Sequence, residues 1–504
     1  MNTIKHFSLL IGSFLIIIIF SFFLILQTEY SYHLIESLSV FVRFYFGKYY
    51  LFLGFLCVII VVLFAILPTG NIRLGTKGEK PIYSMLEWMA MLYSAGMGAG
   101  ILLRAVQEPV YMKLHPPIQN EIAPNIIALE YVFYHWGFTA WAFYALFAII
   151  IGFYLYKQNA PVVISSAFNG MGTLIKNEQI VFNTLWVIDI LCIFTTVVGL
   201  VAAVGLGTTQ ISGGLTYLTN ISFSLPFVIG IVMLISLIAG YSAYIGVTRG
   251  IKIISKYNIY CTIFLLLFVF FQGNIVSIAG DFCLALYYYI TDFIFLSLAI
   301  GKFDPGEAFL TEWTYYYWAF WLAWAPFTGI FIARISRGRT LRELALGVLF
   351  IPSLGTFFWF SAFGSSAFQF IETMEIYDGK YDNVFTSIYF FFSQYPFQTF
   401  MNALTVVLLI SFLVTSLDSA IFVLSMFTDH GYQNPNKKHR ILWGFALTLF
   451  TIGIIILGSV KENSDVLVAM QKLLIVTSLP FSLLLIVMLL LFIRTVYNYK
   501  KQEA

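Results

Sequence analysis

Long apolar runs separated by short polar segments dominate this chain. An α-helix needs about 20 apolar residues to cross a bilayer. Twelve runs are predicted to do so, at residues 8–27, 49–67, 85–107, 128–156, 182–206, 222–243, 258–275, 312–334, 343–363, 401–427, 440–459 and 468–495. The apolar segment 278–299 carries Asp281 and Asp292, and we expect it to lie along the outer membrane interface. The pattern predicts an all-α integral membrane protein with 12 transmembrane helices.

The composition narrows the function classes. Of the 504 residues, 60% are hydrophobic and 10% are charged, whereas a soluble domain carries about 25% charged residues. Because the chain is so apolar, we expect membrane lipid as a partner. The net charge of +3 is small, so we expect no nucleic-acid partner. The four cysteines form no CxxC pair, and no nucleophile or metal-ligand motif occurs. We therefore expect neither an enzyme nor a resident cofactor.

The distribution of Lys and Arg predicts the orientation. If the N-terminus is cytoplasmic, 19 of the 27 Lys and Arg residues lie in inner loops and ends, and the outer loop 364–400 is acidic. Cytoplasmic loops carry an excess of these residues. We therefore expect a multi-pass protein of the cell membrane with both termini in the cytoplasm.

Helix 85–107 contains the sequence SAGMGAG at residues 94–100. Three glycines in five residues weaken a helix by roughly 1 kcal/mol each relative to alanine. Backbone freed from a helix inside a membrane is tolerated where it lines a cavity, and broken helices build substrate and ion sites in many transporters. The alternative interpretation is close packing of two helices through small residues.

Two hydroxyl side chains, Thr415 and Ser416, follow one another in helix 401–427. Together with freed carbonyls of helix 85–107, they would form a set of hard oxygen ligands suited to sodium. The alternative is that both hydroxyls bond to their own helix.

Aromatic side chains gather at matching depths. Trp136, Trp141 and Tyr144 share one side of a continuous helix over 128–156, and Trp318, Trp321 and Trp324 share one side of helix 312–334. Trp141 and Trp321 lie near the middle of their spans, deeper than interfacial belts. A neutral cage of ring faces attracts a quaternary ammonium by about 0.5–2 kcal/mol per ring. These helices therefore predict a site for an onium compound.

An ordered set of motifs runs along the chain. They are GMGAG at 96–100 followed by Glu108-Pro109, HWG at 135–137, GLG at 205–207, the Trp-rich stretch 318–324, ARISRGRT at 333–340 and TSLDS at 415–419. In this order, the motifs resemble the betaine/choline/carnitine transporter family from about Gly75 to Phe481. The resemblance implies a leucine-transporter-like inverted repeat of five plus five helices, helices 3–7 and 8–12. It also implies a homotrimer with segment 278–299 at the contact.

The expected organisation follows from that resemblance. Residues 1–75 would hold two peripheral helices, 76–275 the first repeat, 276–305 the outer interfacial helix and linker, 306–496 the second repeat, and 497–504 a short cytoplasmic tail.

The resemblance also assigns two sites. The substrate site would comprise Trp136, Trp141, Tyr144 and Trp321, with Trp324 nearby, against Gly96, Gly98 and Gly100. The sodium site would comprise the carbonyls of Ser94, Met97 and Phe412 and the hydroxyls of Thr415 and Ser416.

Arg104 departs from the family pattern, which usually has aromatic residues near this position. It precedes Glu108 by four residues, so one interpretation is a snorkelling arginine with a helical partner. The others are an outer-gate charge pair, a contact to the substrate carboxylate, and a built-in cation that weakens sodium dependence. Glu108 is a second gate or coupling candidate, and Asp418 a candidate for the inner gate.

The expected function is import of a quaternary-ammonium or sulfonium zwitterion such as glycine betaine, by sodium-coupled symport with alternating access. The alternatives are a sodium-independent carnitine- or betaine-type exchanger, a choline transporter, and an onium sensor that does not transport.

Overall fold

The computed structural model describes residues 2–76, 78–96, 98–173, 177–246, 248–374, 376–429, 431–432, 434–460 and 466–503. The side-chain surroundings of residues 2–8, 94–96, 169, 172–173, 248–252 and 503 lie outside this description.

The regular secondary structure of the described residues is helical, apart from one isolated antiparallel bridge between Arg73 and Thr340, and turns and loops connect the helices. The α-helices are α1 (Asn2–Leu26), α2 (Thr28–Ile66), α3 (Met85–Gly96), α4 (Ala99–Arg104), α5 (Gln107–Leu114), α6 (Pro124–Trp136), α7 (Phe138–Lys157), α8 (Glu178–Thr219), α9 (Leu225–Ile245), α10 (Thr248–Gln272), α11 (Ile275–Leu298), α12 (Glu307–Phe309), α13 (Tyr315–Ile335), α14 (Leu341–Glu372), α15 (Ser387–Ser393), α16 (Gln398–Thr428), α17 (Lys437–Gly458) and α18 (Val466–Glu503). Short 3₁₀ helices are η1 (Pro68–Asn71), η2 (Ile164–Thr173) and η3 (Gly301–Phe303), and η4 (Leu310–Thr314) is a π-helix.

Within the described residues, 12 helical segments are long and apolar enough to cross a membrane, which confirms the predicted number. These twelve segments match the predicted spans with one difference, in which one predicted span is missing and another helix takes its place. The span predicted over 85–107 is divided among α3, α4 and α5, each too short to cross alone. The helix α11 meets the length and composition requirements instead, so its interfacial position stays a prediction.

The predicted break at the glycine motif is confirmed, because α3 ends at Gly96 and α4 begins at Ala99. A second break was not predicted: residues 128–156 do not form one continuous helix, since α6 ends at Trp136 and α7 begins at Phe138. A Cβ atom on Gly137 would lie 2.5 Å from the Phe357 ring, so only glycine fits this junction.

The core of the bundle forms around α7 and α13, which pack closely along their lengths. Every residue of α7 from Thr139 to Tyr154 is buried, as expected of a helix that is apolar on all sides. Gly329 of α13 permits the approach, because a Cβ atom there would lie 2.7 Å from the Phe147 ring.

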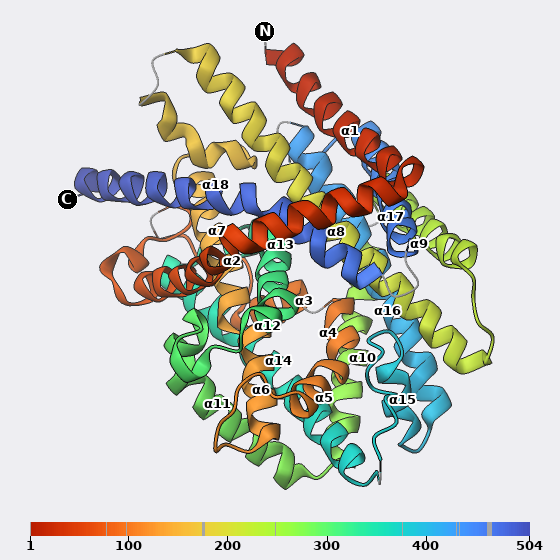
Figure 1. Ribbon diagram of the computed structural model, residues 1–504. Helices are drawn as coiled ribbons and strands as arrows, with labels where there is room; N and C mark the ends of the chain where they lie inside the picture. Colours follow the sequence, from red (N-terminus) through yellow and green to blue (C-terminus); the bar gives the residue numbers. More distant parts are fainter. Residues whose placement is uncertain are drawn as a thin grey trace.

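The surrounding helices enclose this centre. Helices α8 and α16 pack against each other, and α18 contacts both α2 and α13 (Figure 1). Helix α1 packs mainly on α17, and its apolar window is 33% buried, compared with 89% for the α6–α7 segment. Helix α1 therefore lies at the edge of the bundle, whereas α2 contacts the central helices α7 and α13.

Candidate functional site

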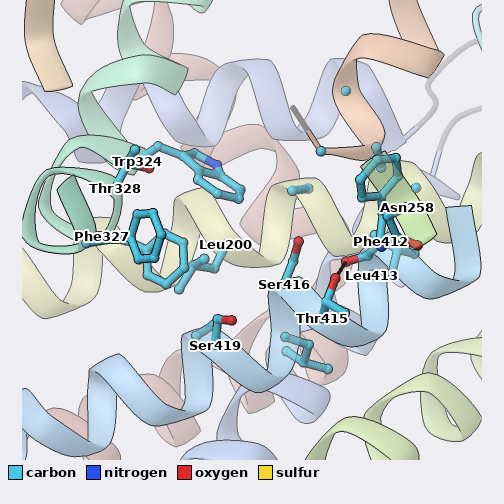
Figure 2. A pocket seen from close by; sticks show the side chains of 18 of the residues that line it. Leu200, Asn258, Trp324, Phe327, Thr328, Phe412, Leu413, Thr415, Ser416 and Ser419 are labelled. Atoms are coloured by element: carbon cyan, nitrogen blue, oxygen red, sulfur yellow. Dashed lines mark hydrogen bonds between the residues drawn. The ribbon is translucent and has the colours of Figure 1, made fainter. Parts of the chain in front are cut away.

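A cavity of about 560 Å³ lies among α3, α4, α6, α7, α8, α10, α13 and α16. Many of the predicted site residues line it, namely Gly98, Gly100, Arg104, Trp136, Tyr144, Trp321, Trp324, Phe412, Thr415 and Ser416. Figure 2 shows part of its wall, where Trp324, Phe327 and Leu200 lie on one side and Thr415 and Ser416 project from α16.

Aromatic rings from three helices meet in this cavity. The ring centroids of Trp136 and Trp321 are 5.1 Å apart at 72°, and those of Tyr144 and Trp321 are 6.2 Å apart at 89°. Tyr317, one turn before Trp321 on α13, also lines the cavity and lies 5.6 Å from Trp136. Because α6, α7 and α13 each contribute, the rings surround a space rather than forming a single stack.

The indole N–H groups of these tryptophans are bonded within the protein. Trp321 donates to the backbone carbonyl of His135 at 2.9 Å, and Trp136 donates to the carboxylate of Glu108 at 3.0 Å. Trp324 donates to a backbone carbonyl of α8 at 3.0 Å. These bonds hold the rings in place, and the cage presents π faces to a ligand. Such a surface suits a methylated onium group, which has no N–H to donate.

Trp141 occupies a different position from the other predicted cage residues. It is buried on α7 and packs edge-on against Tyr144 with ring centroids 5.5 Å apart, beside the residues that line the cavity. The predicted alignment of Trp136 with Trp141 and Tyr144 assumed one helix, but the break at Gly137 separates them. Trp136 and Tyr144 reach the cavity from two helices.

The glycine motif borders the cage. A Cβ atom on Gly98 would have no neighbour within 4 Å, and one on Gly100 would lie 3.4 Å from the Trp136 ring. Ser94, Gly96 and Met97 lie outside the residues whose surroundings the structure describes. The Gly100 backbone therefore lies close to the Trp136 ring, and Gly98 faces open space.

The helix α16 contributes oxygen atoms. Phe412, Thr415 and Ser416 line the cavity, and the Thr415 hydroxyl donates to the carbonyls of Ser411 at 3.0 Å and Phe412 at 3.1 Å. Since its proton points to its own helix, the Thr415 oxygen can offer lone pairs to a cation. Neutral oxygens of this kind are chemically suited to sodium.

A fully buried cluster surrounds Glu108 behind the cage. One carboxylate oxygen bonds Nδ1 of His135 at 3.0 Å, and the other accepts from the Trp136 indole and the Tyr317 hydroxyl. Nε2 of His135 lies 3.2 Å from the Thr314 hydroxyl. The cluster ties α5, α6 and α13 together, so two cage rings are fixed by the same carboxylate.

Arg104 ends α4 and is only 4% exposed. Its guanidinium donates to Gln107 Oε1 at 2.6 Å and lies 4.8 Å from the Trp313 ring centroid. Arg104 lines the main cavity and also a second cavity of about 500 Å³ that Gln107 and Trp313 share. It therefore stands in the wall between the two spaces.

These features agree with comparisons to known proteins. The profile described as "BCCT, betaine/carnitine/choline family transporter" matches residues 8–501, nearly the whole chain. The chain belongs to this family. It is therefore a multi-pass membrane transporter and not an enzyme, as predicted.

The relatives of this family member are named for different substrates. The glycine betaine transporter OpuD of Bacillus subtilis is 35% identical over 458 residues, covering 90% of this chain and 87% of that protein. The ectoine/hydroxyectoine transporter of Virgibacillus pantothenticus is 31% identical over 475 residues, covering 93% and 92%. The high-affinity choline transport protein of Escherichia coli is 32% identical over 481 residues, covering 93% and 68%.

Other residues of this transporter lie where sequence reasoning did not place them. Tyr317 was not predicted, although its position four residues before Trp321 puts it on the same helix face. The role of His135 as the partner of Glu108 was also missed. Asp418 is buried on α16, does not appear among the cavity-lining residues, and interacts electrostatically with Arg440 of α17.

Proposed function

We propose that this transporter imports a quaternary-ammonium or sulfonium zwitterion, glycine betaine first, by sodium-coupled symport. The observation that carries the proposal is the neutral aromatic cage of Trp136, Tyr144 and Trp321 beside the hydroxyls of Thr415 and Ser416 in one cavity. The names of the relatives OpuD and the ectoine/hydroxyectoine transporter agree with a zwitterionic substrate.

In the proposed mechanism, the substrate and sodium bind to different residues of the cavity. The onium group enters the cage, where each ring contributes about 0.5–2 kcal/mol. Sodium is held between the Thr415 and Ser416 hydroxyls and backbone carbonyls of the α3–α4 break. Because sodium would lie between the α3–α4 break and α16, its binding would join the two halves of the proposed inverted repeat. Rocking of one helix group against the other then exposes the site to each side in turn.

The described conformation is proposed to face the cytoplasm. The cavity extends from the cage to Lys256 of α10, an exposed residue on the side where Lys and Arg gather. The cluster around Glu108 is fully buried, and we propose that it closes the cavity toward the other side of the membrane. The proposed assembly is a homotrimer with α11 at the contact, and both termini are placed in the cytoplasm.

The test is uptake of labelled glycine betaine by liposomes that contain the purified protein. An inward sodium gradient should drive accumulation above the external concentration, and its removal should abolish accumulation. Uptake that is indifferent to sodium would overturn the coupling, and no specific uptake of betaine would overturn the proposed substrate.

Sodium-independent exchange is the second candidate, and Arg104 is the observation that favours it. A buried guanidinium beside the site supplies a permanent positive charge, which reduces the need for a bound cation. Exchange predicts that uptake in sodium-free buffer requires substrate inside the liposome. Choline transport, the activity in the name of the Escherichia coli relative, is separated from betaine transport by direct competition.

A further inference from the structure

Asn258 of α10 is a polar residue of the cavity wall that sequence reasoning did not identify. Its side chain is buried and lines the main cavity, and Figure 2 shows it at the same end of the cavity as Phe412 and Thr415. It comes two residues after Lys256, where the cavity reaches its proposed cytoplasmic opening. Because a helix rises about 1.5 Å per residue, Asn258 lies about 3 Å deeper along α10 than Lys256.

The oxygen of the Asn258 amide is bonded to α16. The Ser411 hydroxyl donates to Oδ1 of Asn258 at 2.5 Å. That distance falls in the range of O–H···O bonds and is shorter than N–H···O bonds usually are, so it is the amide oxygen that faces Ser411. The carbonyl of Ser411 accepts the Thr415 hydroxyl at 3.0 Å. Asn258 is therefore held next to Thr415, a residue of the proposed ion site.

The nitrogen of the same amide is an unused donor. Nδ2 of Asn258 donates no hydrogen bond to any residue that the structure describes. It is also not one of the enclosed side-chain atoms that lack a partner, so it is accessible from the cavity that Asn258 lines. An unpaired donor in a largely apolar wall costs free energy. Its two N–H groups therefore need an acceptor that water or a ligand in the cavity supplies.

The chemistry of the amide decides which ligand atoms it can bind. An N–H₂ group has two donors and no acceptor, so it repels sodium and attracts oxygen atoms that carry negative charge. Among the described residues that line the cavity there is no Asp or Glu, so no carboxylate of the lining competes for these donors. A zwitterion such as glycine betaine carries one carboxylate, and its onium group has no hydrogen-bond acceptor. The carboxylate is therefore the group that fits Nδ2.

We propose that Asn258 is a specificity-determining residue whose Nδ2 donates to the carboxylate of a zwitterionic substrate beside the ion site, with the onium group directed to the aromatic cage. This inference rests on the proposed function, because it assumes a zwitterion and sodium in this cavity. Since Asn258 and Thr415 share Ser411, the bound carboxylate lies close to the bound sodium. Opposite charges attract, so each ligand strengthens the binding of the other. Choline offers Nδ2 only a neutral hydroxyl, which makes a weaker bond.

The first experiment uses Asn258→Asp in the purified full-length protein. This substitution keeps the size of the side chain and an oxygen for the Ser411 hydroxyl, and it replaces the two N–H donors with a carboxylate oxygen. Binding of glycine betaine, of choline and of sodium alone is measured by tryptophan fluorescence. The Kd of glycine betaine should rise at least about tenfold because like charges repel, while the Kd of choline should stay unchanged or fall. The sodium concentration for half-maximal response should fall, because a new negative charge lies beside the ion.

These opposite shifts separate a substrate contact from a structural role, since damage to the fold weakens all three ligands. Asn258→Ala is the second variant, and it should weaken glycine betaine binding more than choline binding. Asn402→Asp is the matched control, because Asn402 is a buried asparagine of α16 that does not line the cavity and whose Nδ2 donates to the Tyr389 carbonyl. It should leave the ratio of the two affinities unchanged.

Two kinds of failure can be told apart. If the unmodified protein binds glycine betaine but its affinity relative to choline is the same in Asn258→Asp and Asn258→Ala, the role of Asn258 is overturned and the proposed function stands. A change of this ratio in Asn402→Asp equal to that in Asn258→Asp would also overturn the role of Asn258. If the unmodified protein binds neither onium compound, the proposed function is overturned and the inference falls with it.

Discussion

Trp321 provides the sharpest test of the aromatic cage. Its ring lies 5.1 Å from Trp136 and 6.2 Å from Tyr144 by centroid, so it forms the junction between the walls of the cage. Trp321→Leu keeps an apolar side chain and removes the π face. The lost hydrogen bond to the His135 carbonyl affects free and loaded protein alike and cancels in the affinity. One ring contributes about 0.5–2 kcal/mol, so KM should rise about 2-fold to about 30-fold.

The assay is initial-rate uptake of labelled glycine betaine in liposomes, with the amount of inserted protein matched between variants. Trp321→Phe keeps a ring and should recover part of the affinity. Trp318→Leu is the control, because Trp318 is buried on the same helix but does not line the cavity and packs on Tyr134 instead. The cage assignment is refuted if Trp321→Leu leaves KM unchanged, or if Trp318→Leu raises KM equally.

Three further predictions concern the ion site, the glycine motif and a buried acid. Thr415→Ala should raise the sodium concentration for half-maximal uptake about tenfold, since a hard cation loses an oxygen ligand. Thr405→Ala should not, although its hydroxyl bonds α16 in the same way, and equal effects would contradict the assignment. Gly100→Leu should reduce betaine uptake more than about tenfold, because the larger side chain would push against the Trp136 indole. Gly100→Ala should keep most of the uptake. A larger loss in Gly100→Ala than in Gly100→Leu would contradict the contact between Gly100 and Trp136. Glu130 is buried in α6, and neither carboxylate oxygen has a hydrogen-bond partner among the described residues. Glu130→Met should therefore raise the apparent unfolding temperature in detergent by removing a penalty of about 1–3 kcal/mol, and a lower temperature would contradict this reasoning.

The helical architecture was largely predictable because the membrane imposes it. Every backbone polar group in a bilayer must be bonded internally, so apolar runs of sufficient length become helices. The break in the glycine motif was predictable for the same local reason, since glycine weakens a helix wherever it stands. The break at Gly137 was not, because a single glycine is often tolerated in a helix. There the ring of Phe357, from a distant helix, excludes any side chain.

The sequence predicted which aromatic side chains gather around one cavity, but not how they are arranged. Trp136, Tyr144 and Trp321 were expected to form a cage and do line one cavity, whereas Trp141 packs beside it. Tyr317 and the partners of Glu108 emerged only from the structure. In the sequence, a buried Glu and a buried His are two isolated polar residues, and their separation of 27 positions gives no sign of contact.

The sequence by itself determined that the protein lies in a membrane, where its helical spans run and which types of side chain a binding site could use. Those properties depend on apolar length, residue chemistry and local helix weakness, which need no partner. Only the tertiary structure decided which faces meet. Glu108 and Tyr317, 209 positions apart, share a hydrogen bond, and Arg104 stands between two cavities. Such contacts depend on how close-packed helices fit together, and many helix pairings satisfy the same apolar pattern.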